Sequence, residues 1–249
     1  MSAPGILAAR ILGDHPHGFT TREGGASRGA FSSLNLSATV GDDPARVQEN
    51  WERLRAATGL DFARVRQVHG CRVVEAVAGT GTDPVEEADA VATSTPGVAA
   101  CVSVADCVPV LLADPRSGAV AAVHAGWRGT IEGAAAAGVK ALVDRHGAQP
   151  SEMLAAIGPG IGPCCFEVSR DLAVRFRDEI GRVTANSRDQ GSRVDLWRAN
   201  EILLRRAGLV RRRIETLGRC TSCEERTFFS HRRDRGVTGR HVAFISAVS

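Results

Sequence analysis

The chain has 249 residues, of which 43% are hydrophobic, and this length allows one large core or two small ones. Charged residues, glycine or proline interrupt every apolar run before it reaches the roughly 18 residues of a transmembrane helix, so we expect a soluble protein without membrane contact. The net charge is only +3, basic residues are mostly interspersed with acidic ones, and tyrosine is absent. These features argue against nucleic acid as a partner.

The start of the chain lacks the basic segment before an apolar run that marks a signal peptide, which favours a cytoplasmic location. Seven cysteines are an odd number, and the adjacent pair Cys164 and Cys165 suits a disulfide framework poorly. We therefore expect reduced thiols or metal ligands. Cys220 and Cys223 form a single CxxC pair, which we interpret as structural or incidental because the sequence holds no second CxxC pair.

The first clear helix signal runs from Asp43, a capping residue followed by proline, to Gly59, with an apolar stripe between them. Short runs rich in β-branched residues then predict strands at 63–68, 71–77, 98–104, 108–113 and 118–123. The glycine-rich turn at 126–129 leads into an alanine-rich segment that predicts one helix over about 130–146. Free amides from Thr130 onward could hold an anion there.

A second unit follows, with a strand at 153–157, a glycine- and proline-rich turn, and a helix near 169–181 that Ser169 caps. The remaining signals are a helix over 195–207 and strands near 213–217 and 241–246. Strands and helices in this order indicate layered α/β or α+β architecture. Because no linker divides the chain, we expect one domain over residues 1–249.

Cys107 and His124 are the most informative residues of the chain. Cys107 lies between two predicted strands and His124 ends a third, so both should emerge at one edge of a buried sheet. Thiolate and imidazole are zinc ligands. On these residues alone, Cys107 as a small buried hydrophobe and His124 as a core hydrogen-bonding residue remain alternatives.

Eight short motifs occur in order over nearly the whole chain. They are Thr21-Arg-Glu-Gly-Gly25, Ser33-Leu-Asn-Leu36, Gly41-Asp-Asp-Pro44, Gln67-Val-His-Gly70, Ala105-Asp-Cys-Val-Pro109, His124-Ala-Gly-Trp-Arg-Gly129, Ile157-Gly-Pro-Gly-Ile-Gly-Pro163 and Phe229-Ser-His-Arg-Arg-Asp234. Together they closely resemble the multifunctional purine nucleoside phosphorylase family, formerly called the laccase-domain or polyphenol oxidase family.

The resemblance implies an α+β fold of one domain, with a mixed β-sheet or β-sandwich core flanked by helices. It implies a zinc enzyme that cleaves adenosine, inosine, guanosine and methylthioadenosine with inorganic phosphate, and that also deaminates adenosine. The implied zinc ligands and catalytic residues are His69, Cys107 and His124. The family pattern implies that Ser33 and Asn35 belong to the substrate pocket, and Arg22 and Arg128 are candidate donors to phosphate. Asp106 is the fifth predicted substrate-binding residue, with orientation of a metal ligand and capping of a turn as its alternative roles. We expect a monomer or a homodimer.

Two other functions remain open. One is a laccase-like copper oxidoreductase acting on phenols, although multicopper chemistry requires several histidine-rich motifs and the seven histidines here are scattered. The other is a cell-envelope factor that controls peptidoglycan precursor composition, a role in which members of the resembled family have been implicated.

Overall fold

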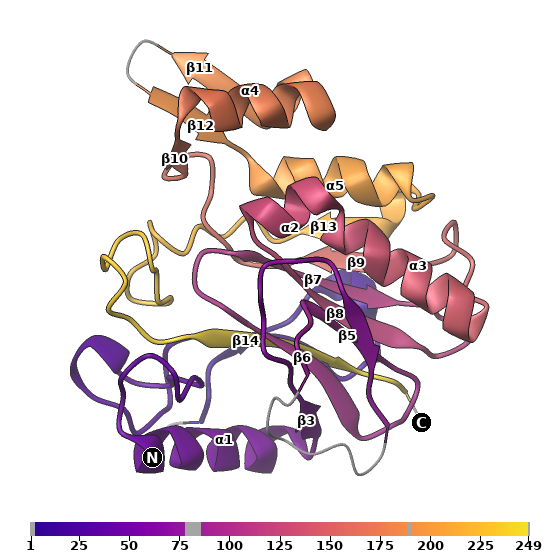
Figure 1. Ribbon diagram of the computed structural model, residues 1–249. Helices are drawn as coiled ribbons and strands as arrows, with labels where there is room; N and C mark the ends of the chain where they lie inside the picture. The colour runs from indigo at the N-terminus through magenta and orange to yellow at the C-terminus, as the bar shows by residue number, and fades with distance from the viewer. Residues whose placement is uncertain (1–2, 78–85, 189–190, 249) are drawn as a thin grey trace.

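The computed structural model describes residues 3–77, 86–188 and 191–248, and two β-sheets stacked face to face form its centre (Figure 1). The six-stranded sheet has the order β13-β9-β7-β8-β5-β4 and the five-stranded sheet the order β1-β2-β14-β6-β3. Each sheet contains parallel and antiparallel pairs. The structure therefore confirms the mixed-sheet α+β architecture.

The six-stranded sheet consists of β4 (Val73–Glu75), β5 (Ala90–Thr93), β7 (Val108–Ala113), β8 (Val120–Ala125), β9 (Leu154–Ile157) and β13 (Ile214–Thr216). The five-stranded sheet consists of β1 (Ile6–Leu7), β2 (His17–Thr20), β3 (Asp61–Ala63), β6 (Val98–Val104) and β14 (His241–Ser246). A small third sheet contains β10 (Glu167–Val168), β11 (Ala185–Arg188) and β12 (Gly191–Val194).

The helices are α1 (Pro44–Thr58), α2 (Trp127–Glu132), α3 (Ala134–His146), α4 (Arg170–Glu179) and α5 (Leu196–Arg206). Short 3₁₀ turns are η1 (Arg10–Leu12), η2 (Gly29–Phe31), η3 (Arg182–Thr184) and η4 (Arg211–Arg213). α1 covers the outer face of the five-stranded sheet, whereas α3 and α5 cover the outer face of the six-stranded sheet (Figure 1). The result is a four-layer stack of helix, sheet, sheet and helices.

Strand alternation produces these layers. In β6, Ala99 and Cys101 pack against α1, while Ala100 and Val102 pack between the sheets. Both faces of β6 and β7 are thus buried, so their sequences are continuously apolar. The same alternation turns the odd-numbered residues of β7 and the even-numbered residues of β8 toward the five-stranded sheet. Cys107 and His124 continue these two sets.

The helix predicted over 130–146 is wrong at its start. The chain forms two helices, α2 and α3, because Gly133 takes a φ of 84° that ends the first and begins the second. The Thr130 amide donates to the Gly126 carbonyl at 2.7 Å, so it is not available to an anion. By contrast, α1 begins and ends at its predicted caps, Asp43 and Gly59.

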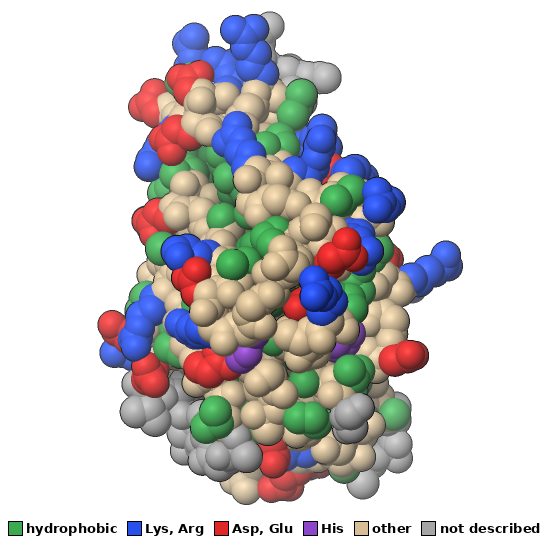
Figure 2. All heavy atoms as spheres, turned by 90° about the vertical axis from the view of Figure 1, so that its right-hand side faces the viewer, with side chains coloured by type: hydrophobic (Ala, Val, Ile, Leu, Met, Phe, Trp, Pro, Cys, Tyr) green, Lys and Arg blue, Asp and Glu red, His purple; other side chains and the backbone are tan. Residues whose placement is uncertain are grey.

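Among the described residues, no helix is both long and apolar enough to cross a membrane. Basic and acidic side chains are interspersed over the face shown in Figure 2. This mixture agrees with the small net charge of the chain.

His241 in β14 supplies a test of stability against pH. Its ring is buried, and its Nε2 accepts a hydrogen bond from the Phe229 amide at 2.9 Å. Burial, reinforced by the charges of Arg22 and Arg240, lowers the pKa of His241 from 6.5 to about 3. Between these values the unfolded chain binds a proton that the folded protein excludes, so the folded state loses stability as pH falls.

We expect this residue to contribute a slope of up to about 1.4 kcal/mol per pH unit to the free energy of unfolding between pH 6.5 and about 3. Denaturant titration of the wild type and of His241→Asn across this window measures the difference. A difference between the two proteins that stays constant with pH would contradict the assignment.

Candidate metal centre and its cavity

Three residues from separate segments meet at one end of the sheet sandwich. His124 is in β8, Cys107 directly precedes β7, and His69 lies in the loop after β3. The antiparallel pairing of β7 with β8 places Pro109 opposite His124 and so brings Cys107 near it. The ligand atoms of the three residues all lie within 4.8 Å of one another. This His69–Cys107–His124 cluster could hold a metal ion.

Asp89 holds two residues of the cluster in place through hydrogen bonds. It is fully buried at the start of β5, and the pairing of β5 with β8 places it beside His124. One carboxylate oxygen accepts from the His69 amide at 2.9 Å and lies 2.8 Å from His124 Nδ1. The other accepts from the amides of Val68 and Gly70 at 3.2 and 2.7 Å. Because an ionised carboxylate only accepts, Nδ1 of His124 carries the proton and Nε2 is left for a metal.

The negative charge of Cys107 and the positive charge of His124 stabilise each other. Burial raises the pKa of the Cys107 thiol, but the charge of His124 and hydrogen bonds with His124 and His69 outweigh it and bring the pKa to about 6. Burial lowers the pKa of His124, but the Cys107 sulfur and Asp89 outweigh it and raise the pKa to about 9. In the metal-free protein, Cys107 is therefore a thiolate at neutral pH, the form that binds metals.

Two residues of this site have an unusual backbone. His69 has a φ of 65° and Asp106 a φ of 86°, a region that residues other than glycine rarely adopt. The Asp106 carboxylate accepts hydrogen bonds from Thr221 Oγ1 and the Arg232 amide, both at 2.6 Å. These bonds hold the residue directly before Cys107 in its strained conformation.

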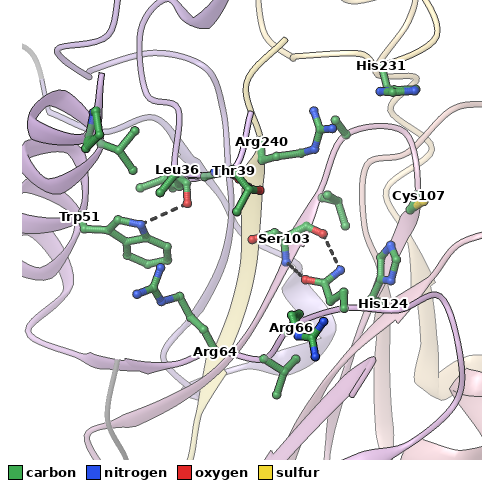
Figure 3. Close-up of a pocket in the computed structure, with 18 of the residues that line it drawn as sticks. Leu36, Thr39, Trp51, Arg64, Arg66, Ser103, Cys107, His124, His231 and Arg240 are labelled. Atoms are coloured by element: carbon green, nitrogen blue, oxygen red, sulfur yellow. Dashed lines mark hydrogen bonds between the residues drawn. The ribbon is translucent and has the colours of Figure 1, made fainter. Parts of the chain in front are cut away.

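The cluster opens into a cavity of about 870 Å³ (Figure 3). One wall comes from α1 and the segment before it, including Leu36, Thr39 and Trp51. The other comes from the ends of β3, β6 and β8 and from the segment before β14. The arginines of the described lining are Arg55, Arg64, Arg66 and Arg240 and its histidines are His69, His124 and His231; none of the described lining residues is Asp or Glu.

Three predicted substrate-binding residues lie outside the described lining of the cavity. Arg22 donates to the carbonyls of Ser32 and Glu225, and Ser33 Oγ donates to the Arg22 carbonyl. Arg128 is exposed and lies over the ring of Trp127. The structure does not bring Arg22, Ser33 or Arg128 to the cavity wall.

Asn35 and Asp106 do not line the cavity themselves but fix the backbone of residues that do. Asn35 is fully buried, and its Oδ1 accepts from the amide of Arg240 at 2.9 Å. It therefore fixes the backbone of an arginine that does line the cavity. Asp106, likewise outside the described lining, fixes the backbone before Cys107.

Sequence reasoning missed Asp89 and the cavity arginines. An aspartate directly before the buried run Ala90–Thr93 was a readable signal for Asp89, since a carboxylate at the end of a buried strand requires partners. Nothing local marks Arg64 or Arg240, because their side chains meet only after the two sheets have packed. Gln67, the first residue of the motif that contains His69, accepts from the Ser103 amide at 2.7 Å and donates to the Ser103 carbonyl at 2.8 Å, and so joins the His69 loop to β6.

Because Gly126 has no side chain, Cys107 and His69 can occupy the space beside it. A Cβ at this position would lie 2.9 Å from Cys107 Sγ and 3.2 Å from His69 Cδ2, although its backbone conformation suits alanine. We expect Gly126→Ala to lower the metal affinity of the cluster roughly 10-fold, as loss of a supporting contact does. Competition with a chelator measures this loss of metal affinity. In the control Gly70→Ala the new Cβ is 3.6 Å from its nearest neighbour, so equal losses in both variants would contradict the steric reason.

The chain is similar to known proteins over nearly its full length. A family model described as multi-copper polyphenol oxidoreductase laccase matches residues 16–248. The chain belongs to this laccase-domain family. The family relatives include a purine nucleoside phosphorylase of Deinococcus radiodurans, 43% identical over 249 residues, which cover 98% of this chain and 94% of the relative.

A second laccase-domain relative is the purine nucleoside phosphorylase YlmD of Geobacillus stearothermophilus, 39% identical over 92% of this chain and 88% of its own. The crystal structure of YlmD from that organism superposes with a TM-score of 0.93 at 36% identity, over 100% of this chain and 98% of that chain. The structure of YfiH from Bacillus licheniformis also has a TM-score of 0.93, at 33% identity, over 99% and 98% of the two chains. These superpositions agree with the α+β fold described above.

Proposed function

We propose that this chain is a zinc-dependent purine nucleoside phosphorylase that cleaves adenosine, inosine, guanosine and methylthioadenosine with phosphate, and that it also deaminates adenosine. The products of phosphorolysis are the base and ribose 1-phosphate or its methylthio derivative. The observation that carries this proposal is the cavity. Its described lining joins four arginines and a potential metal cluster without a carboxylate, which suits an anionic co-substrate. The names of the relatives support the same activity.

Phosphate recognition is assigned to Arg240 and Arg64. In the described structure, the side-chain hydrogen bonds of Arg240 come from Nη1, which donates to the carbonyls of Thr238 and Gly239. Nε and Nη2 are thereby left for an oxyanion, and the half-buried position strengthens their attraction. Arg64 lies 4.5 Å over the ring of Trp51, which orients its guanidinium beside the same cavity (Figure 3).

The residues at the end of the cavity fit a zinc ion. One thiolate and two imidazoles are the donors that zinc prefers, and three ligands leave a fourth position open. Asp89 holds His124 in the tautomer that presents Nε2. When bound, zinc would supply a Lewis acid and lower the pKa of water, the chemistry that deamination requires. We infer that His69, Cys107 and His124 are its ligands.

In phosphorolysis an oxygen of hydrogen phosphate forms a bond to C1′ of the ribose, and the glycosidic bond to the purine breaks. The departing base gains one proton, which balances the proton that the hydrogen phosphate loses. Arg240 and Arg64 would hold the phosphate in position for this attack and offset its charge. The cavity is lined by segments from residue 36 to residue 240, which supports our inference that residues 1–249 act as one domain.

A copper oxidoreductase acting on phenols is the second candidate, because two histidines and one cysteine also form the core of a blue-copper site. The description of the family model favours it as well. Against it, His69 and His124 are the two histidines in the cluster, whereas a multicopper enzyme requires several histidine-rich motifs.

The deciding experiment incubates the purified protein with each of the four nucleosides, with and without phosphate, and separates the products. We expect base and the sugar 1-phosphate only when phosphate is present, and inosine from adenosine. Arg240→Gln should raise the KM for phosphate, while Arg128→Gln, whose side chain lies outside the described lining, should not. Base release that is independent of phosphate, or oxidation of phenols without nucleoside turnover, would overturn the proposal.

A further inference from the structure

Four of the seven cysteines gather at a second place, apart from the His69–Cys107–His124 cluster. Cys164 and Cys165 follow the turn after β9, and Cys220 and Cys223 follow β13. The four sulfur atoms all lie within 4.8 Å of one another. Cys223 Sγ is 3.5 Å from Cys164 Sγ and 3.4 Å from Cys165 Sγ. The pair that sequence reasoning left isolated therefore has a partner pair that is adjacent in sequence rather than spaced as CxxC.

Backbone pairing brings the two segments together. β9 and β13 are parallel neighbours, and the pairing continues past their ends, where Gly160 bridges Cys220. The Gly160 amide donates to the Arg219 carbonyl at 3.2 Å, and the Thr221 amide donates to the Gly160 carbonyl at 3.0 Å. The sulfur atoms thus meet because the strands are in register, not because four small apolar side chains have collapsed together.

The distances suit four ligands around one ion. A zinc–sulfur bond of about 2.3 Å in a tetrahedral site places neighbouring sulfurs about 3.8 Å apart. The distances from Cys223 Sγ to the sulfurs of Cys164 and Cys165, 3.5 and 3.4 Å, are a few tenths of an ångström shorter than this value, and all four sulfurs stay within 4.8 Å of one another. A disulfide joins one pair at about 2.05 Å, and all four residues are free thiols here.

Two backbone amides are directed at the sulfur atom of Cys220. The Gly162 amide donates to Cys220 Sγ at 3.3 Å, and the amide of Cys223 donates to the same sulfur. Hydrogen bonds from backbone amides stabilise a metal-bound sulfur. Cys220 is buried and Cys165 half-buried, whereas Cys164 and Cys223 are exposed, so an ion can enter from solvent.

We propose that Cys164, Cys165, Cys220 and Cys223 bind one zinc ion as a closed, four-thiolate structural site. Binding replaces the four thiol protons, which are released to solvent, and involves no change in oxidation state. The ion would crosslink the turn after β9 to the turn after β13. The second turn contains Thr221, whose hydroxyl donates to Asp106, so the crosslink would also stabilise the backbone directly before Cys107.

The test counts zinc in the full chain purified without chelators. We expect two ions per chain in the wild type, one in Cys223→Ser, one in His124→Ala and none in the double variant. The control Cys71→Ser removes an exposed cysteine that belongs to neither group of ligands, so this variant should retain two zinc ions. Cys223→Ser should also lower the melting temperature more than Cys71→Ser, because a structural zinc ion stabilises the fold.

A second measurement covers the case in which Cys223→Ser does not fold. X-ray absorption at the zinc edge of His124→Ala should show four sulfur neighbours at about 2.3 Å. A mixture of nitrogen and sulfur neighbours, zinc-free His124→Ala, or a disulfide among the four cysteines would overturn the proposal. These readouts do not involve nucleosides, so failure of the proposed enzymatic function would leave them unchanged.

Discussion

Replacing Cys107 with alanine is expected to remove one metal ion per chain and to lower kcat/KM for phosphorolysis by more than about 100-fold. Loss of a residue that merely supports a ligand costs roughly 10- to 100-fold in metal affinity or activity, and loss of the thiolate itself should cost more. The reason is specific to this site. Cys107 is the one ligand of the His69–Cys107–His124 cluster that carries a negative charge, and the high pKa of His124 depends on it.

Metal analysis and steady-state kinetics on Cys107→Ala measure this effect, with Cys71→Ala as the matched control. Cys71 is exposed and lies outside the cluster, two residues from His69, so its variant should keep full metal content and activity. Activity that survives in Cys107→Ala would remove this cluster from the reaction. Unchanged metal content would remove Cys107 from the ligands.

The second large effect is expected from Asp89→Asn. Each carboxylate oxygen of Asp89 faces two groups, the His69 amide and His124 on one side and the amides of Val68 and Gly70 on the other. Whichever way an asparagine amide turns, its NH₂ group faces hydrogen-bond donors. Because the residue is fully buried, we expect the free energy of unfolding to fall by roughly 3 kcal/mol. Metal affinity should fall roughly 10- to 100-fold.

Asp114→Asn is the matched control for this change. Asp114 is also buried, but it serves a turn between β7 and β8, where one oxygen accepts from the amide and hydroxyl of Ser117. Asparagine retains such an acceptor. Denaturant titration and chelator competition on both variants separate the two cases, and equal losses would show that the metal centre does not depend on Asp89.

The central layers of the fold were predictable because burial on both faces makes a strand continuously apolar. β6 and β7 were predicted at their observed bounds for this reason. β2 and β5 were missed, because the four-residue sequences His-Gly-Phe-Thr and Ala-Val-Ala-Thr are too short for their pattern to be distinguished from that of a loop. Their place in a sheet is decided by the strands beside them, which is information from the tertiary structure.

The candidate site, like the fold, could be predicted only in part. Cys107 and His124 end apolar runs, so their meeting at a sheet edge could be anticipated, and the family resemblance added His69. Arg22 and Arg128 were predicted as candidate donors to phosphate, but in the structure Arg22 donates to the carbonyls of Ser32 and Glu225, and Arg128 lies over the ring of Trp127. The contacts around the four cysteines could not be anticipated, because they depend on the register of β9 against β13.

The order of strands in the five-stranded sheet also has a consequence for synthesis. β14, residues 241–246, lies between β2 and β6, whose sequences are translated long before it. Until that segment leaves the ribosome, the nascent chain exposes two unpaired strand edges and lacks Arg240 at its cavity. Contacts of such large sequence separation form slowly, so we expect the pairing of β14 with β2 to be a late step of folding.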